Sequence, residues 1–135
     1  MNDVPLIIAG SLGVLAAGVH GVGGEVLVVR KLSLGTLPGS RFGGPRMTKA
    51  MIHVTWHMTT VAFLTVGVAL LLAGTVLDGD AAQGIAVVAA AATTGFAALA
   101  LGLGIAYMRS PRSLFRHPGP IALTACAVLA WLGAL

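Results

Sequence analysis

Hydrophobic and polar positions divide the chain into four long apolar stretches joined by shorter polar connections. The apolar stretches cover residues 4–29, 48–77, 81–108 and 119–135. A helix needs about 20 apolar residues to cross a bilayer, so the first three stretches are long enough and the fourth would span with local bilayer thinning. The pattern predicts an all-α, membrane-embedded antiparallel four-helix bundle, with residues 1–135 forming a single transmembrane domain.

Local signals support these helix limits. Pro45 precedes the second apolar stretch and can occupy the first turn of a helix. Asp78 and Gly79 suit a tight turn, and Asp80 suits the positive N-terminus of the third helix. Small residues recur at helical spacing and would let helix backbones approach closely. They form the stripes Ala9, Gly13, Ala16, His20 and Gly10, Val14, Ala17, Gly21 in the first helix, and Ala91, Gly95, Ala98, Gly102, Ala106 in the third.

Composition and charge place the chain in a membrane and orient it. Hydrophobic residues make up 57% and charged residues 9%, against roughly 25% charged in soluble domains. The formal charge of +4 does not indicate nucleic acid, because the cations flank apolar stretches. Basic loops stay in the cytoplasm, which predicts a multi-pass membrane protein with both termini outside. The topology charges are Arg30, Lys31, Arg41, Arg46, Lys49, Arg109, Arg112 and Arg116.

Five ionisable side chains lie in or beside the apolar stretches on the predicted cytoplasmic side. Ionisable groups are costly in a bilayer and usually face partners or water. The helical rise places His20 and His57 at a similar depth, about 12–15 Å below the boundary, with Glu25 and His53 about 6–8 Å deep. The candidate ligands for a metal ion or a b-type haem are therefore His20, Glu25, His53, His57 and His117.

The spacing of these residues favours some combinations over others. His53 and His57 are four residues apart, so they share a helix face and can hold one metal ion, with a carboxylate from another helix completing a common ligand set. His20 and Glu25 are five residues apart, about 140° around a regular helix. These two residues would share a site only if the glycines between them allowed a local distortion.

Several neighbouring residues receive packing or supporting roles. Trp56, Thr59 and Thr60 lie beside the histidines on the second helix and are expected to pack or to hydrogen-bond around the ligands. Cys126 lies in an apolar run and is expected to be a packed thiol. No nucleophile–base arrangement is visible, and the other carboxylates lie on the opposite side. The sequence therefore predicts no catalytic residue, and an enzyme is the less favoured interpretation.

The chain resembles a family of small four-span bacterial integral membrane proteins. The resemblance is carried by His20-x4-Glu25, Leu37-Pro38, the run from Trp56 to Thr59, and His117. It implies that His20, Glu25, Trp56, His57, Thr59 and His117 match the recurrent polar positions of that family. His53 is not part of the motif. The resemblance implies a structural class and no particular activity.

Three functions remain open at this point. The first is a binding module that holds a metal ion or haem b through the histidines and Glu25. The second is a proton or metal-ion transporter that uses the same residues. The third is a structural or assembly bundle that forms a homo-oligomer or joins a larger membrane complex through its Gly and Ala faces. An enzyme acting on a lipid-soluble substrate is a weaker fourth.

Overall fold

The structure is a computed structural model that describes residues 1–108 and 117–135, and within these residues it contains helices and turns but no strand. A single antiparallel bridge joins Ser40 and Gly43. The helical elements are α1 (Asp3–Gly18), a π-helical turn η1 (Val19–Gly23), α2 (Gly24–Leu27), the 3-10 turns η2 (Val29–Lys31) and η3 (Leu34–Thr36), α3 (Pro45–Thr75), α4 (Gly79–Met108) and α6 (Gly119–Ala134).

The N-termini of the long helices carry residues that favour the start of a helix. The Asn2 side chain accepts a hydrogen bond from the Val4 amide at 3.3 Å and so caps α1. Pro45 opens α3, as the sequence predicts. Asp80 lies in the first turn of α4, and Gly79, the first residue of this helix, adopts a φ of 59°. The uninterrupted helix expected over residues 4–29 is instead an α-helix, a π-turn and a short second α-helix.

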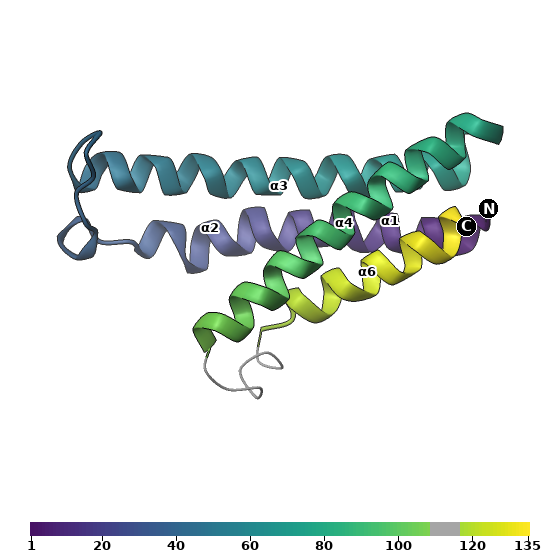
Figure 1. The fold of residues 1–135 in the computed structure, drawn as a ribbon. Helices are drawn as coiled ribbons and strands as arrows, with labels where there is room; N and C mark the ends of the chain where they lie inside the picture. The colour runs from purple at the N-terminus through teal and green to yellow at the C-terminus, as the bar shows by residue number, and fades with distance from the viewer. Residues whose placement is uncertain (109–116) are drawn as a thin grey trace.

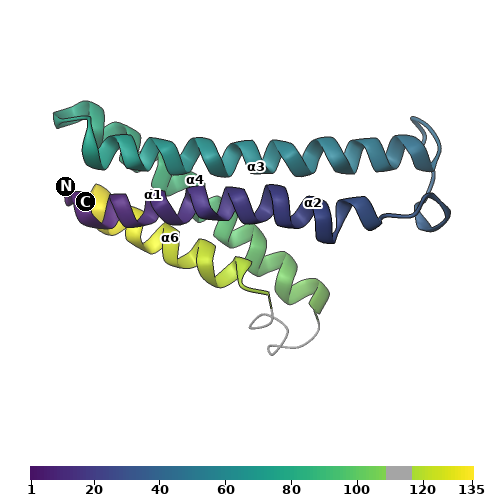
Figure 2. The same cartoon turned by 180° about the vertical axis from the view of Figure 1, so that it is seen from behind.

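Each of the four main helices packs against two others. Helix α1 contacts α3 and α6, and α4 contacts the same two partners. The two termini lie together at one end of the molecule (Figure 1), where the Asn2 amide donates to the Gly133 carbonyl at 2.9 Å. In both views α2 stays beside α3, whereas α4 and α6 diverge from these helices toward the other end (Figures 1 and 2).

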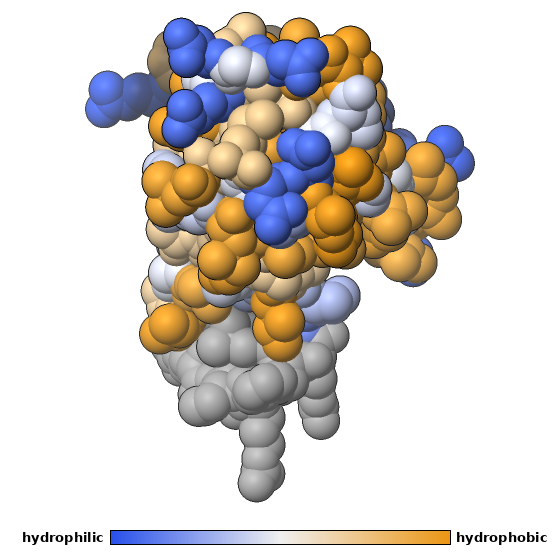
Figure 3. All heavy atoms as spheres, turned by 90° about the vertical axis from the view of Figure 1, so that its right-hand side faces the viewer, coloured by the Kyte–Doolittle hydropathy of each residue, from blue (hydrophilic) through white to orange (hydrophobic). Residues whose placement is uncertain are grey.

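The surface of the bundle is largely apolar. Three helical segments are long and apolar enough to cross a membrane: Asp3–Lys31, Pro45–Thr75 and Gly79–Tyr107. Helix α6 is equally apolar but shorter. Large hydrophobic side chains point outward along the helices, including Val22 at 72% and Val88 at 71% exposure. Seen toward the end that carries the termini, hydrophobic residues cover much of the surface (Figure 3).

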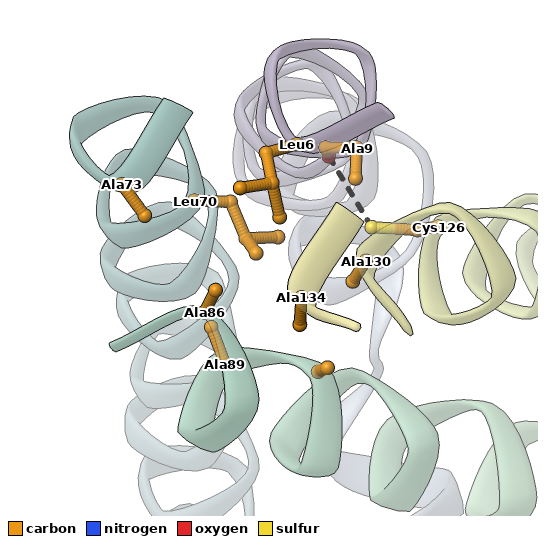
Figure 4. Packing of buried hydrophobic residues seen from close by; sticks show 10 residues of the cluster. Leu6, Ala9, Leu70, Ala73, Ala86, Ala89, Cys126, Ala130 and Ala134 are labelled. Carbon is orange, nitrogen blue, oxygen red and sulfur yellow. Dashed lines mark hydrogen bonds between the residues drawn. The ribbon is translucent and has the colours of Figure 1, made fainter. Parts of the chain in front are cut away.

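The buried core lies near the end with the termini and is built mainly of alanine. Leu6 and Leu70 fill its centre, and small side chains from all four helices surround them (Figure 4). Cys126 is buried there, as expected, and its thiol contacts the Ala9 carbonyl at 3.3 Å. Alanine at these positions lets the helix backbones come close, and close packing is what holds helices together in lipid.

Helices α1 and α3 approach most closely where glycines of the two helices meet. A Cβ atom built on Gly67 would lie 2.7 Å from the Val14 amide nitrogen and 3.0 Å from the Gly10 carbonyl oxygen. A Cβ atom on Gly13 would lie 2.9 Å from the Gly67 Cα. These neighbours are backbone atoms and cannot rotate away, so only glycine permits the observed separation.

We expect Gly67→Ala to lower the free energy of unfolding by about 1–3 kcal/mol, because overpacking a close contact forces backbone shifts. Gly95→Ala is the matched control, since a Cβ there meets no described atom within 4 Å. The measurement is thermal unfolding of both variants in detergent. Equal midpoints for the two variants would show that the α1–α3 contact is not close in solution.

Candidate metal centre

The carboxylate of Glu25 in α2 lies against two histidines of α3. Its Oε2 atom is 3.1 Å from His53 Nε2 and 3.4 Å from His57 Nε2. One ligand atom from each of these three residues lies within 4.8 Å of the other two. His53 and His57 share a helix face because they are four residues apart. Their rings are tilted by 48°, with centroids 5.0 Å apart.

The π-turn explains how Glu25 reaches α3. His20 and Glu25 would point about 140° apart on a regular helix. In η1 the Gly24 amide reaches back to the Val19 carbonyl, five residues earlier, and this inserts an extra residue into the turn. Residues five apart are thereby brought onto nearly one face. His20 and Glu25 both contact α3 as a result, Glu25 through the histidine pair and His20 through Thr60.

A second departure from α-helical geometry brings Arg30 to the same carboxylate. Helix α2 ends at Leu27, and Val28 leaves the helix with φ −123° and ψ −66° before the 3-10 turn η2. Arg30 can then turn back, and its Nε atom donates to Glu25 Oε1 at 3.2 Å. The Arg30 side chain is 70% exposed, whereas the Glu25 side chain is 16% exposed.

The two oxygens of Glu25 therefore have different surroundings. Oε1 accepts the Arg30 hydrogen bond, but Oε2 is buried and has no hydrogen-bond partner within residues 1–108 and 117–135. The two imidazole Nε2 atoms lie 3.1 and 3.4 Å from Oε2, close enough to pair with it when the rings are protonated. A buried polar atom without a partner is costly, and a cation between Oε2 and the two Nε2 atoms would supply one.

The separations match a metal ligand set. Zinc binds imidazole nitrogen and carboxylate oxygen at about 2.0–2.2 Å, so neighbouring ligands of a tetrahedral ion lie about 3.3–3.6 Å apart. The two Nε2–Oε2 distances of 3.1 and 3.4 Å are close to this edge length. The third separation, between ligand atoms of the two histidines, lies within the 4.8 Å that encloses all three residues' ligand atoms. The arrangement can therefore hold one divalent ion through three protein ligands.

The outer face of α3 beside the two histidines is open, and a fourth ligand could reach the site from it. This mostly apolar face is formed by His53, Val54, His57, Met58, Val61 and Ala62. A site with three protein ligands and one open position can bind water or exchange its ion, unlike a closed structural site.

His20 lies in a separate aromatic cluster. Its ring stacks on Trp56, with centroids 4.5 Å apart and planes 14° apart, and meets the edge of Phe63 at 5.4 Å. His20 Nδ1 lies 3.0 Å from the Thr60 hydroxyl, which donates to the Trp56 carbonyl at 3.2 Å. Thr60 has a single hydroxyl proton, so when it donates to the Trp56 carbonyl, His20 Nδ1 must carry the proton of the His20–Thr60 pair.

Trp56 also stabilises the π-turn itself. Its Nε1 donates to the His20 carbonyl at 2.9 Å, which gives a partner to a carbonyl in the irregular turn. Gly24 packs directly on the Trp56 indole, and a Cβ at Gly24 would overlap the ring. Thr60 similarly contacts Gly21, where a Cβ would lie 2.7 Å from the Thr60 methyl. Gly21 and Gly24 are thus required by the residues of α3 that face them.

The remaining candidate residues take other places. His117 is exposed at the start of α6, where its Nδ1 accepts a hydrogen bond from the Gly119 amide at 3.3 Å. Thr59 donates to the Thr55 carbonyl of its own helix. Lys49, one of the topology charges, donates to the Leu32 carbonyl at 2.8 Å. The topology charges Arg109, Arg112 and Arg116 lie outside the described residues.

The structure brings Glu25, His53 and His57 into one group of potential ligands, and neither His20 nor His117 belongs to it. The pairing of His20 with His57, which the helical rise favours, is not formed, because His57 faces Glu25 while His20 packs on Trp56. Arg30 is the residue that the sequence analysis missed, since it was interpreted only as a topology charge. No sequence signal marks it, because on a regular helix a residue five positions after Glu25 points away.

Comparisons of the chain with known protein families, with characterised proteins and with solved structures find no match. The functional argument therefore depends on the geometry of the chain itself. The resemblance to small four-span bacterial membrane proteins stays a prediction.

We expect Trp56→Phe to lower the free energy of unfolding by about 1 kcal/mol, the typical net contribution of one hydrogen bond. The phenyl ring keeps much of the packing on Gly24 and His20 but cannot donate to the His20 carbonyl. Hydrogen exchange measures the local effect, and the amides of residues 21–25 should exchange faster.

Trp131→Phe is the matched control, because it removes the Nε1 bond to Thr94 Oγ1 at the other end of the bundle. If both variants left exchange at residues 21–25 unchanged, the indole would not stabilise the π-turn.

Proposed function

We propose that this protein is a membrane-embedded helical bundle that binds one divalent transition-metal ion through Glu25, His53 and His57. The observation that carries the proposal is the convergence of Glu25 Oε2 and the two Nε2 atoms, at 3.1 and 3.4 Å, on a buried oxygen without a hydrogen-bond partner in the described chain. Ionisable residues inside a bilayer usually serve ions or partners.

The donor set limits which ions are suitable. Two imidazoles and one carboxylate, with room for further ligands, suit Zn²⁺ or Fe²⁺, while an all-oxygen shell would suit Mg²⁺ or Ca²⁺. The three ligands favour a metal ion over haem b. Haem b would need axial ligands on its two faces, and the packing of His20 on Trp56 gives no support to a pairing of His20 with His57.

Removing a ligand should remove the ion. We expect purified protein in detergent to bind about one Zn²⁺ per chain, and His57→Ala to weaken the affinity by more than about 100-fold, since even loss of an outer-shell partner costs 10–100-fold. Glu25→Gln should have a similar effect because the neutral amide loses the charge that attracts the ion. Isothermal titration with Zn²⁺ and elemental analysis measure both.

His117→Ala is the matched control, because His117 lies outside the ligand group, and its affinity should equal that of the wild type. Zinc binding that survived His57→Ala and Glu25→Gln but was lost in His117→Ala would contradict the proposal. An absorption spectrum of the same preparation with a haem Soret band would favour the haem alternative.

We also propose that the four helices form an antiparallel bundle embedded in the bacterial inner membrane, with both termini outside. Three helices of sufficient length and apolarity support the embedding. The orientation is supported by charge: Arg30, Lys31, Arg41, Arg46 and Lys49 cluster around the connection between α2 and α3, whereas Asp78 and Asp80 flank the connection between α3 and α4. Positive connections stay in the cytoplasm. The metal site would then lie near the cytoplasmic side.

Cysteine labelling tests this orientation. A Ser40→Cys variant should resist membrane-impermeant maleimide in intact cells and react after the membrane is opened, because Ser40 lies in the basic connection. A Gly79→Cys variant should react in intact cells and serves as the counterpart. Cys126 is buried and should give little background. Labelling of Ser40→Cys from outside would overturn the orientation.

A further inference from the structure

Arg30 forms an ion pair with the proposed metal ligand and leaves the metal-facing oxygen free. Its Nε atom donates to Glu25 Oε1 at 3.2 Å, while Oε2 faces His53 and His57. The guanidinium and the histidine pair therefore hold opposite oxygens of one carboxylate. A metal ion bound to Oε2 would therefore share the negative charge of Glu25 with the Arg30 guanidinium.

The charges at this site nearly cancel before any ion arrives. Glu25 contributes one negative charge, and the Arg30 guanidinium contributes one positive charge that is not lost at any accessible pH. Histidine ligands must be neutral to bind a metal. A divalent ion would therefore enter a ligand set of about zero net charge and would be repelled by a fixed cation a few ångströms away.

We propose that Arg30 is an internal counter-cation that weakens metal binding at Glu25, His53 and His57, so that the site takes up and releases its ion and does not store it. The inference rests on the proposed metal binding and adds its regulation. Arg30 competes with the ion for the charge of Glu25 and neutralises that charge when the ion has left.

The exposure of the two partners supports this role. The Arg30 side chain is 70% exposed and the Glu25 side chain 16% exposed, so the guanidinium can move toward water while the carboxylate stays in place. The pair also depends on the turn η2 rather than on a regular helix. The neighbouring cation, Lys31, forms no ion pair within the described residues. The weakening of metal binding is therefore assigned to Arg30 and not to the basic connection as a whole.

The test is the dissociation constant for Zn²⁺ of the full chain in detergent, measured by titration against a competing chelator. Arg30→Gln removes a like charge that lies a few ångströms from the ion and should lower the dissociation constant by about tenfold, an effect limited by the exposure of the guanidinium to water. Arg30→Lys keeps a cation and should stay within about threefold of the wild type. The zinc dissociation rate of Arg30→Gln should fall in parallel.

Lys31→Gln is the matched control for the change in total charge and should stay near the wild type. Arg30→Ala is a second neutral variant, in case Arg30→Gln assembles poorly. An unchanged or weaker affinity in the neutral Arg30 variants would overturn the inference and would assign Arg30 to positioning the carboxylate. A wild-type protein that binds no zinc would remove the proposed function together with this inference.

Discussion

The close approach of α1 and α3 is the constraint on which the rest of the structure depends. Four glycines of the first helical segment meet α3: Gly10, Gly13, Gly21 and Gly24. Gly67 packs between the first two, and Thr60 and Trp56 contact Gly21 and Gly24. This small-residue seam lets side chains on the two helices meet, so that one carboxylate can reach two imidazoles across the interface.

The seam continues past the point where a regular helix would turn away from α3. The π-turn η1 corrects the helical phase and returns Glu25 to the face that carries His20. Its cost in backbone geometry is offset by the Trp56 hydrogen bond to the His20 carbonyl. Local π-turns are frequent at functional sites because they reposition a side chain without breaking a helix. Here the repositioned side chain is the carboxylate that the histidine pair faces.

The helical class and much of the site were predictable from sequence because they depend on composition and on spacing within one helix. The apolar stretches indicated three long helices and a shorter fourth, and His53 and His57 were recognisable as a pair at one helical turn. The contact of Glu25 with the histidine pair of α3 could not be predicted from the sequence. Regular helical geometry places Glu25 and His20 on different faces of the helix, so it does not show which of them faces α3. The glycines between them signalled a distortion, but only the packing of Trp56 and Thr60 decides its form.

The depth argument failed for His20 because depth along the membrane does not specify the direction of a side chain. His20 and His57 were matched by their distance from the boundary, yet His20 stacks on Trp56 and bonds to Thr60, and it is not one of the three residues of the ligand group. Arg30 shows the converse. Its place beside a basic connection suggested topology alone, whereas the turn η2 directs it to Glu25.

The central claim is that Glu25 and the two histidines of α3 bind a metal ion directly. X-ray absorption spectroscopy of the zinc-loaded protein in detergent tests it most directly, because the spectrum identifies the ligand atoms. We predict a first shell of two imidazole nitrogens and one or two oxygens at about 2.0–2.1 Å, with the outer-shell scattering of two histidine rings. A shell of water oxygens only, or one with a single imidazole, would contradict the account.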